Sequence, residues 1–236
     1  MRPLSERNAF LILLAGLAGW IDAFSFTELG QVFTSFQSGN FIFLGLAIAQ
    51  GDGERLLGAA VSLAAFLGGT AVGAYAVGRA EVEWSGLRTL APVFALECAL
   101  LVGFAACWQV VGEPGGYSAA RMALIVLAAA AMGIQGGAVF ALRIPGVVTN
   151  AMTATLMLGG VLLGLRARDA DAAREASPVS AGFLAAMCGS YVVSAILVGA
   201  MDAPAVTSAV PGAVLALLLV GLAARRAAPR RTAVAG

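Results

Sequence analysis

Two acidic residues lie inside long apolar stretches of this 236-residue chain, where acidic side chains are rare. Asp22 falls within the run 9–29, and Glu97 falls within the run 89–111. An aspartate near the centre of a bilayer costs about 2.5–3.5 kcal/mol on insertion scales, so it needs a polar partner or a wet cavity. Both residues are therefore candidates for binding a solute or a coupling proton. The alternative for Asp22 is to cap a neighbouring helix, and for Glu97 to be a protonated packing residue.

A polar stretch, "TSFQSGN", precedes the apolar run "FIFLGLAIA" at residues 34–49. Its hydroxyl and amide groups can replace the hydration shell of a small solute. Serine and asparagine are favoured at helix N-caps, so the pattern predicts a short helix that begins near Asn40. Such a helix would point its positive dipole end into the membrane. The alternative is an ordinary helix whose polar side chains bond its own backbone or a neighbouring helix. The candidate site residues here are Thr34, Gln37, Ser38, Gly39 and Asn40.

A second polar stretch, "TNAMTATL" at 149–156, follows Pro145 and Gly146. Interruptions at matching places in two halves of a membrane protein indicate a binding site near the midplane. Thr149, Asn150 and Thr153 are the candidates in this stretch. Gln135, in "MGIQGG", occupies nearly the place in the second half that Asp22 holds in the first. We expect it to be a polar partner opposite Asp22.

The composition is that of a multi-pass membrane protein. Hydrophobic residues make up 60% of the chain and charged residues 11%, against about 25% charged residues in soluble domains. Apolar runs of this length cross a bilayer as helices, so the fold class is all-α. The segments are approximately 9–29, 32–50, 56–78, 89–111, 119–142, 147–165, 179–201 and 205–224. The net charge of +1 argues against nucleic-acid binding.

Catalytic and metal-binding chemistry have little support in the residue types. The chain has no histidine, the commonest general base and transition-metal ligand. Cys98, Cys107 and Cys188 lie in apolar runs without the spacing of a zinc site. We therefore expect no enzyme activity, no cofactor and no bound metal.

The eight segments contain an internal repeat. "AAFLGGTAVGAYAVG" (64–78) aligns without a gap to "AAMCGSYVVSAILVG" (185–199), and "TSFQSGNF" pairs with "TNAMTATL". Small residues four apart in the first pair, such as Gly69 and Gly73, let helices approach closely. We predict one polytopic domain over 1–236, with repeats at 8–111 and 118–224. Residues 225–236 form a basic tail that we expect to be disordered.

The topology depends on whether segments 32–50 and 147–165 cross fully. If they are broken or re-entrant elements, about six helices cross and the two repeats are inverted, as in many secondary transporters. With a cytoplasmic N-terminus, this arrangement places twelve of the fourteen arginines inside, and eight crossings place eleven inside. We favour six crossings, and both arrangements put both termini in the cytoplasm.

At these residues the chain resembles the YoaK family of bacterial integral membrane proteins, a domain of unknown function. The resemblance rests on "GWIDAFSF…GQVFTSFQSGNFIFLGLAIAQGD", with Gly19, Trp20, Asp22 and Ala23 followed by Ser38-Gly39-Asn40. The second-half "GIQGG" also fits, although Gly136 stands where the family often has asparagine. The resemblance covers residues 8–224. It implies a bacterial cytoplasmic membrane protein with roughly six spans.

The function favoured by these patterns is secondary transport of a small solute, with proton coupling through Asp22 or Glu97. No P-loop is present, so direct ATP coupling is not expected. The alternatives are a passive channel and a regulatory or scaffolding membrane protein. The expected partners are the lipid bilayer, a small solute and protons. The glycine-rich segments 56–78 and 179–201 pack either within one chain or between copies, so a homo-oligomer stays open.

Overall fold

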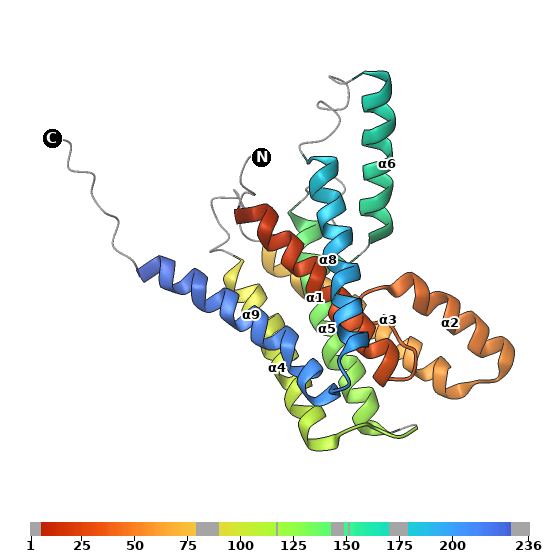
Figure 1. Cartoon of the computed structure of the whole chain (residues 1–236). Helices are drawn as coiled ribbons and strands as arrows, with labels where there is room; N and C mark the ends of the chain where they lie inside the picture. The colour runs from red at the N-terminus through yellow and green to blue at the C-terminus, as the bar shows by residue number, and fades with distance from the viewer. Residues whose placement is uncertain are drawn as a thin grey trace.

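The computed structural model describes residues 6–78, 90–116, 118–142, 149–150, 152–169 and 179–227, and side chains to residue 221. Every regular element in this part of the chain is a helix (Figure 1). The helices are α1 (Glu6–Glu28), α2 (Gln37–Gln50), α3 (Gly53–Gly78), α4 (Ala91–Val111), α5 (Ala119–Ala141), α6 (Met152–Arg168), α8 (Ala181–Ala200) and α9 (Pro204–Ala227).

Six of these helices are long and apolar enough to cross a membrane: α1, α3, α4, α5, α8 and α9. The predicted all-α fold with about six spans is confirmed. The two remaining helices have 14 residues in α2 and 17 in α6. At 1.5 Å per residue they extend about 21 and 26 Å, less than the hydrocarbon thickness of about 30 Å. They correspond to the segments predicted as broken or re-entrant.

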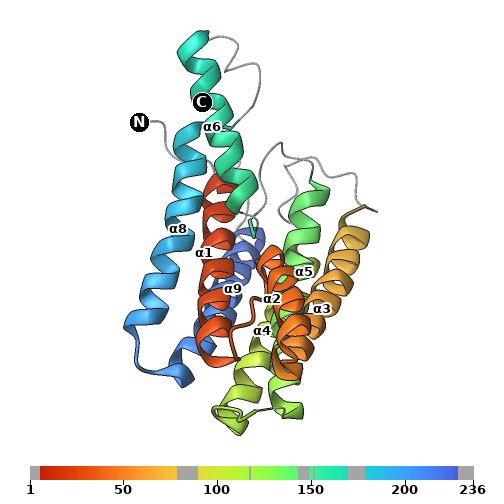
Figure 2. The same cartoon turned by 90° about the vertical axis from the view of Figure 1, so that its right-hand side faces the viewer.

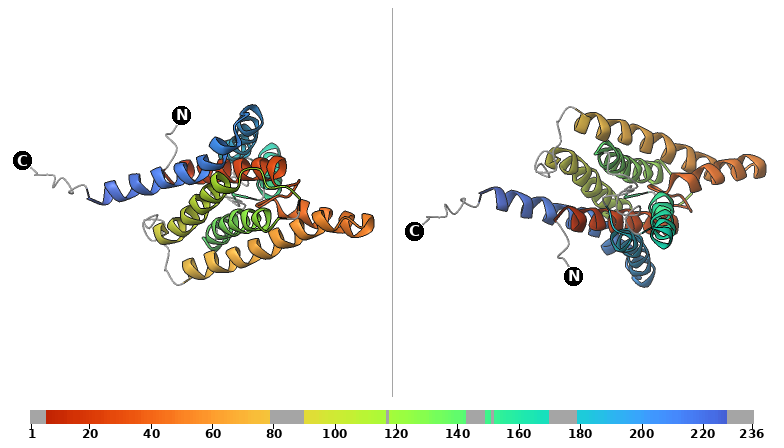
Figure 3. Two further views of the ribbon diagram at one scale, coloured as in Figure 1. Left: turned by 90° about the horizontal axis from the view of Figure 1, so that it is seen from below. Right: turned by 90° about the horizontal axis from the view of Figure 1, so that it is seen from above.

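The bundle has two groups of helices, which are visible when it is viewed along its length (Figure 3). On one side α5 packs against α3 and α4, and α2 packs against α3. On the other side α1 packs against α8 and α9, and α6 packs against α8. The groups meet where α4 contacts α9 and α1 contacts α5. Aromatic side chains add to this contact, with the rings of Phe24 and Trp108 4.8 Å apart.

The helices alternate in direction along the bundle. α1, α4 and α8 run one way, while α3, α5 and α9 run the other way (Figure 2). Both short helices begin near the middle of the bundle and leave toward opposite ends (Figure 2). α2 runs toward the end where α3 begins, and α6 runs toward the end where α8 begins. Each short helix therefore forms a hairpin with the span that follows it.

A close crossing of α3 and α5 depends on glycine. A Cβ atom at Gly69 or Gly73 would meet the carbonyl oxygens of Ala130 or Ile134 on α5. A Cβ at Gly133 or Gly137 would likewise meet backbone atoms of α3. Because backbone lies on both sides of the contact, neither helix can yield by rotating a side chain. Two small-xxx-small faces thus lock α3 onto α5.

A buried proline in α9 is compensated by a tryptophan from α1. Pro211 lies inside the helix and has no N–H to donate to the carbonyl of Thr207 four residues earlier. The indole nitrogen of Trp20 donates to that carbonyl at 2.8 Å. In a bilayer an unpaired carbonyl is costly, so this bond joins α1 to α9 at a defined height.

Several predicted links lie outside the described residues. They are the links 79–88 and 143–146, together with residues 170–178 of the link 166–178. α9 continues to Ala227, so its backbone is helical three residues into the predicted tail. The tail's residues 228–236 lie outside the described residues as well.

The glycine crossing makes a testable prediction for stability. Gly69→Ala should lower the melting temperature of the purified protein, because the added methyl overpacks a contact with no flexible partner, at a cost of about 1–3 kcal/mol. Gly68→Ala is the matched control, since nothing lies within 4 Å of its Cβ position. That change should leave stability equal or raise it, because alanine is the better helix former. Equal melting temperatures for the two variants would contradict the assignment.

Candidate functional site

The loop between α1 and α2 returns the chain into the bundle. α1 ends at Glu28, and Gly30 and Gln31 then have φ angles of 84° and 59°. This left-handed turn reverses the chain direction, which glycine allows at no steric cost. Residues Thr34 to Phe36 consequently lie back against α1, beside Asp22, two turns before the helix ends.

The carboxylate of Asp22 collects the backbone donors of this returning loop. Its Oδ1 atom accepts the N–H groups of Thr34 and Ser35 at 2.8 and 2.7 Å. Its Oδ2 atom accepts the N–H of Phe36 at 3.0 Å and the hydroxyl of Tyr191 on α8 at 2.6 Å. The hydroxyl of Ser35 donates to Oδ2 as well. The hydroxyl of Thr34 is a sixth donor, at 3.4 Å from Oδ1. With six donors on two buried oxygens, Asp22 acts as the cap of α2 and has little acceptor capacity left.

The prediction of an N-cap at Ser38 or Asn40 is therefore wrong. α2 begins at Gln37, and its N-cap Phe36 has no side-chain cap bond. A residue from another helix supplies the acceptor instead, because Asp22 is charged and already lies at this height. Charge-assisted bonds of this kind are stronger than those of a serine or asparagine cap.

Asn40 lies inside α2 and holds the other side of the loop. Its Oδ1 accepts the N–H of Phe33 at 3.0 Å, and its Nδ2 donates to the Phe33 carbonyl at 2.6 Å. Nδ2 also contacts Oε1 of Gln37 and the hydroxyl of Ser62 on α3, at 2.8 and 3.1 Å. Asn40 thereby satisfies backbone groups that would otherwise be unpaired in the membrane. The neighbouring Gly39 leaves room for the rings of Phe33 and Phe36.

The second half builds a different arrangement before α6. Gln135 on α5 donates to the hydroxyl of Thr149 at 2.9 Å and to the Leu14 carbonyl of α1 at 3.1 Å. Its amide thus lies about two turns along α1 from Asp22, rather than opposite it. Asn150 donates to the carbonyl of Met132 at 3.2 Å. A Cβ at Gly136 would overlap the Asn150 amide, so the glycine provides the space for that side chain.

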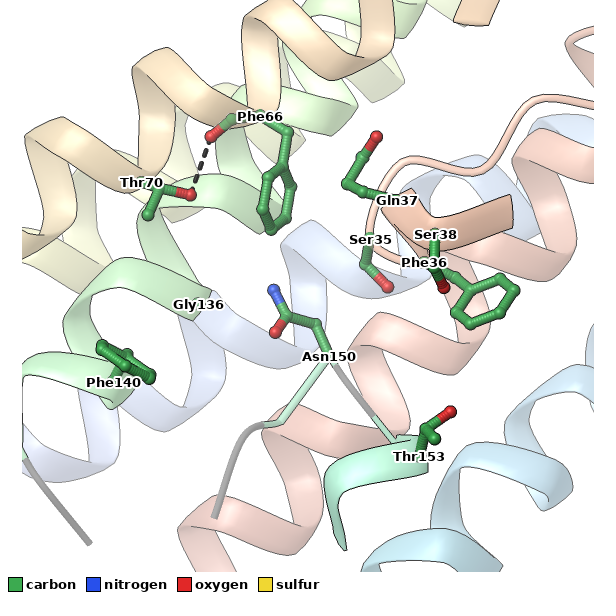
Figure 4. Close-up of a pocket in the computed structure, with 10 residues that line it drawn as sticks. All are labelled: Ser35, Phe36, Gln37, Ser38, Phe66, Thr70, Gly136, Phe140, Asn150 and Thr153. Carbon is green, nitrogen blue, oxygen red and sulfur yellow. Dashed lines mark hydrogen bonds between the residues drawn. The ribbon is translucent and has the colours of Figure 1, made fainter. Parts of the chain in front are cut away.

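A cavity of about 320 Å³ lies where the two short helices begin (Figure 4). α2 and its preceding loop contribute one wall, α3 and α5 a second, and the start of α6 a third. In Figure 4 the Asn150 amide points between Gly136 and Ser35. The lining residues are Ser35, Phe36, Gln37, Ser38, Phe66, Thr70, Gly136, Phe140, Asn150 and Thr153.

The structure brings some of the sequence-predicted site residues to this cavity and leaves others apart. Gln37, Ser38, Asn150 and Thr153 line it. A further group stands directly behind its walls as supports: Asp22, Thr34, Gly39, Asn40, Gln135 and Thr149.

Glu97 is separate from the cavity lining. It is fully buried on α4, and among the described residues neither of its carboxyl oxygens has a hydrogen-bond partner. The adjacent Cys98 donates its thiol to the Gly212 carbonyl of α9 at 3.6 Å. Glu97 therefore belongs to the interface of α4 with its neighbours.

Other residues at the site were not predicted from the sequence. Tyr191, Ser62 and Thr70 lie on predominantly apolar spans, and hydroxyls are common in such helices. The gapless alignment of 64–78 with 185–199 does place Thr70 against Tyr191. That pairing is the sequence signal that connects Thr70 with Tyr191.

Residues 10–223 match the sequence profile of a family described as "Protein of unknown function (DUF1275)". The chain belongs to the DUF1275 family. A curated relative, the "UPF0700 transmembrane protein YoaK" of Bacillus subtilis (strain 168), is 33% identical over 157 residues. These residues make up 66% of this chain and 67% of the relative. No solved structure matches the chain.

The resemblance stated from Gly19–Ala23 and Ser38–Asn40 is thus confirmed. Membership of the DUF1275 family and the six candidate spans agree that this is a multi-pass membrane protein. The family description leaves the activity open, so function must be argued from the geometry of the site.

The two buried acids should respond differently to replacement by the corresponding amides. Asp22→Asn replaces an acceptor oxygen by an NH₂ group, which leaves buried donors unpaired at about 1–3 kcal/mol each. Its melting temperature should fall clearly below that of the unaltered protein. Glu97→Gln is the matched control, because no hydrogen bond of Glu97 is lost. An equal fall in both variants would contradict the capping role of Asp22.

Proposed function

We propose that the protein is a secondary transporter of a small solute. The observation that carries this proposal is that the two short helices, α2 and α6, begin at one cavity near the middle of the bundle. Discontinuous helices that begin at the midplane are typical of transporter binding sites. Irregular backbone at membrane depth is tolerated where it lines a cavity or is buried in protein. Thr34 and Ser35 are buried, and Ser35 and Phe36 line the cavity.

An inverted repeat is part of the proposal, and the helix pairings support it. If α1 to α4 correspond in order to α5, α6, α8 and α9, three of the helix contacts have a counterpart under this correspondence. The pair α3–α5 corresponds to α8–α1, α2–α3 to α6–α8, and α4–α5 to α9–α1. Corresponding helices run in opposite directions (Figure 2), as expected for three crossings per repeat.

Local packing also supports the correspondence. The alignment pairs Gly69 and Gly73 with Ser190 and Ser194. On α1, a Cβ at Gly16 would lie 3.2 Å from the hydroxyl oxygen of Ser194, and a Cβ at Gly19 would lie 2.5 Å from the carbonyl oxygen of Tyr191. The α1–α8 crossing is therefore close in the same manner as α3–α5. Inverted repeats allow the two groups of helices to exchange conformations and expose the cavity to alternate sides.

The proposal places the protein in the bacterial cytoplasmic membrane with both termini in the cytoplasm. Arg55 and Arg121 lie at one end of the bundle, where Arg121 pairs with Glu54. Arg166 and Arg168 lie in the last turn of α6, at the end where α1 begins (Figure 2). Since arginine is enriched on the cytoplasmic side, the arginine-rich end faces inward.

Within this proposal the coupling proton binds Glu97 rather than Asp22. Asp22 already accepts six hydrogen bonds, and a proton there would have to displace donors that hold α2 in place. Glu97 has no such bonds to lose. In proteoliposomes, a pH gradient should accelerate solute flux in the unaltered protein and lose that effect in Glu97→Gln. Retention of the full gradient effect in Glu97→Gln would remove Glu97 from the coupling step.

Flux measurements on reconstituted protein test the transport proposal itself. Uptake should saturate with solute concentration, and preloaded solute should accelerate it by exchange, whereas a passive channel gives neither. Thr153→Val should reduce uptake at low solute concentration about tenfold, the effect of one hydrogen bond of about 1.4 kcal/mol.

Thr27→Val is the matched control for Thr153→Val. Thr27 donates only to carbonyls of its own helix and lies away from the cavity. Its uptake should equal that of the unaltered protein. No flux for any solute in a broad panel would instead favour a scaffolding or regulatory role.

A further inference from the structure

The cavity between α2 and α6 has walls without charge. Its polar groups are the hydroxyls of Ser35, Ser38, Thr70 and Thr153 and the amides of Gln37 and Asn150. No acidic or basic side chain is among the described residues that line it. The ion pair of Glu54 with Arg121 stands at one end of the bundle, away from this lining.

The nearest acid, Asp22, is already used by the protein. It stands behind Ser35, and its two oxygens bond the N–H groups of the loop and the hydroxyls of Ser35 and Tyr191. A cationic solute in the cavity would therefore find no free carboxylate. The same bonds offset the positive end of the α2 dipole, so α2 does not attract an anion either.

The start of α6 has a positive dipole end without an acidic partner among the described residues, and this favours an anion. The effect of a helix terminus reaches at most about 2 kcal/mol. Removing a full charge from water costs several kcal/mol even after the protein relaxes. The dipole alone is too weak to offset that cost, so the cavity discriminates against both signs of charge.

The cavity is also apolar over much of its wall. The rings of Phe36, Phe66 and Phe140 line it alongside the hydroxyls and amides. In Figure 4 the Phe66 ring from α3 and the Asn150 amide from the turn before α6 point toward the same space. Aromatic rings give large contact areas to flat apolar groups, while an amide both donates and accepts hydrogen bonds. The volume of about 320 Å³ is at the small end of the range for ligand pockets.

We propose that this cavity binds an uncharged small molecule that combines a flat apolar body with one or two hydrogen-bonding groups. The proposal rests on the proposed function for its role as a transported solute, but binding is measurable without transport. Asn150 and Ser35, which are 5% and 3% exposed, would hold the polar group, and the phenylalanine rings would cover the apolar body.

Three probes of nearly equal size test the proposal: benzamide, benzoate and benzylammonium. They share one ring and differ in charge. Saturation-transfer NMR on the protein in lipid nanodiscs, with empty nanodiscs subtracted, reports weak binding of each. Benzamide should bind at least tenfold more tightly than either charged probe. Tighter or equal binding of benzoate or benzylammonium in the cavity would overturn the proposal.

Two tryptophan variants locate the binding. Thr153→Trp fills the cavity from an exposed lining position, and Thr27→Trp adds the same ring at an exposed position outside it. The benzamide signal should disappear in Thr153→Trp and persist in Thr27→Trp. A signal unchanged by Thr153→Trp, or no benzamide binding to the unaltered protein, would also overturn the proposal.

The outcomes separate this inference from the transport proposal. Benzamide binding at the cavity without flux of any solute would keep the ligand class and remove transport. Saturable, exchange-stimulated flux of a charged solute that Thr153→Trp abolishes would keep transport and remove the ligand class.

Discussion

The bond between the Asp22 carboxylate and the backbone of residues 34–36 is the interaction on which this structure depends. Backbone N–H groups inside a bilayer must be paired, and the loop before α2 has left its own helix. Asp22 takes three of these donors, and Asn40 with Ser62 pairs the backbone of Phe33. With those groups satisfied, α2 can begin inside the bundle, and the wall of the cavity that Ser35 to Ser38 form is defined.

The two halves solve the same backbone problem with different chemistry. The first half uses a charged carboxylate, which is fully occupied by donors and closed by Tyr191 from α8. The second half has Gly136 on α5, and the neutral amide of Asn150 fills the space beside it. Both arrangements leave hydroxyls and amides, rather than charges, on the cavity wall. Over the described residues the cavity wall is therefore uncharged on both sides, although the two halves reach this result with different residues.

Much of the architecture was predictable because bilayer thickness sets the length of a crossing helix. Eight apolar segments were found, and the polar interruptions at 34–40 and 149–155 marked the two that were predicted as broken or re-entrant. Local N-cap preferences placed the start of α2 near Asn40, which is wrong because α2 begins at Gln37. The alternative given for Asp22, capping a neighbouring helix, is what the structure shows. Tyr191, Ser62 and Thr70 were missed since each looks like an ordinary residue of an apolar span.

The sequence by itself determined that this chain is a multi-pass membrane protein of the DUF1275 family and that its polar residues gather in two short stretches. Hydropathy along the chain is sufficient to identify the spans, and the motif residues Gly19–Ala23 and Ser38–Asn40 indicate the family. The tertiary structure alone decided which polar groups are consumed by the fold and which face the cavity. Asp22 has the residue type of a coupling site, yet six donors from two other segments surround it. Partner choice across 169 residues is a property of helix packing, and a linear pattern does not encode it.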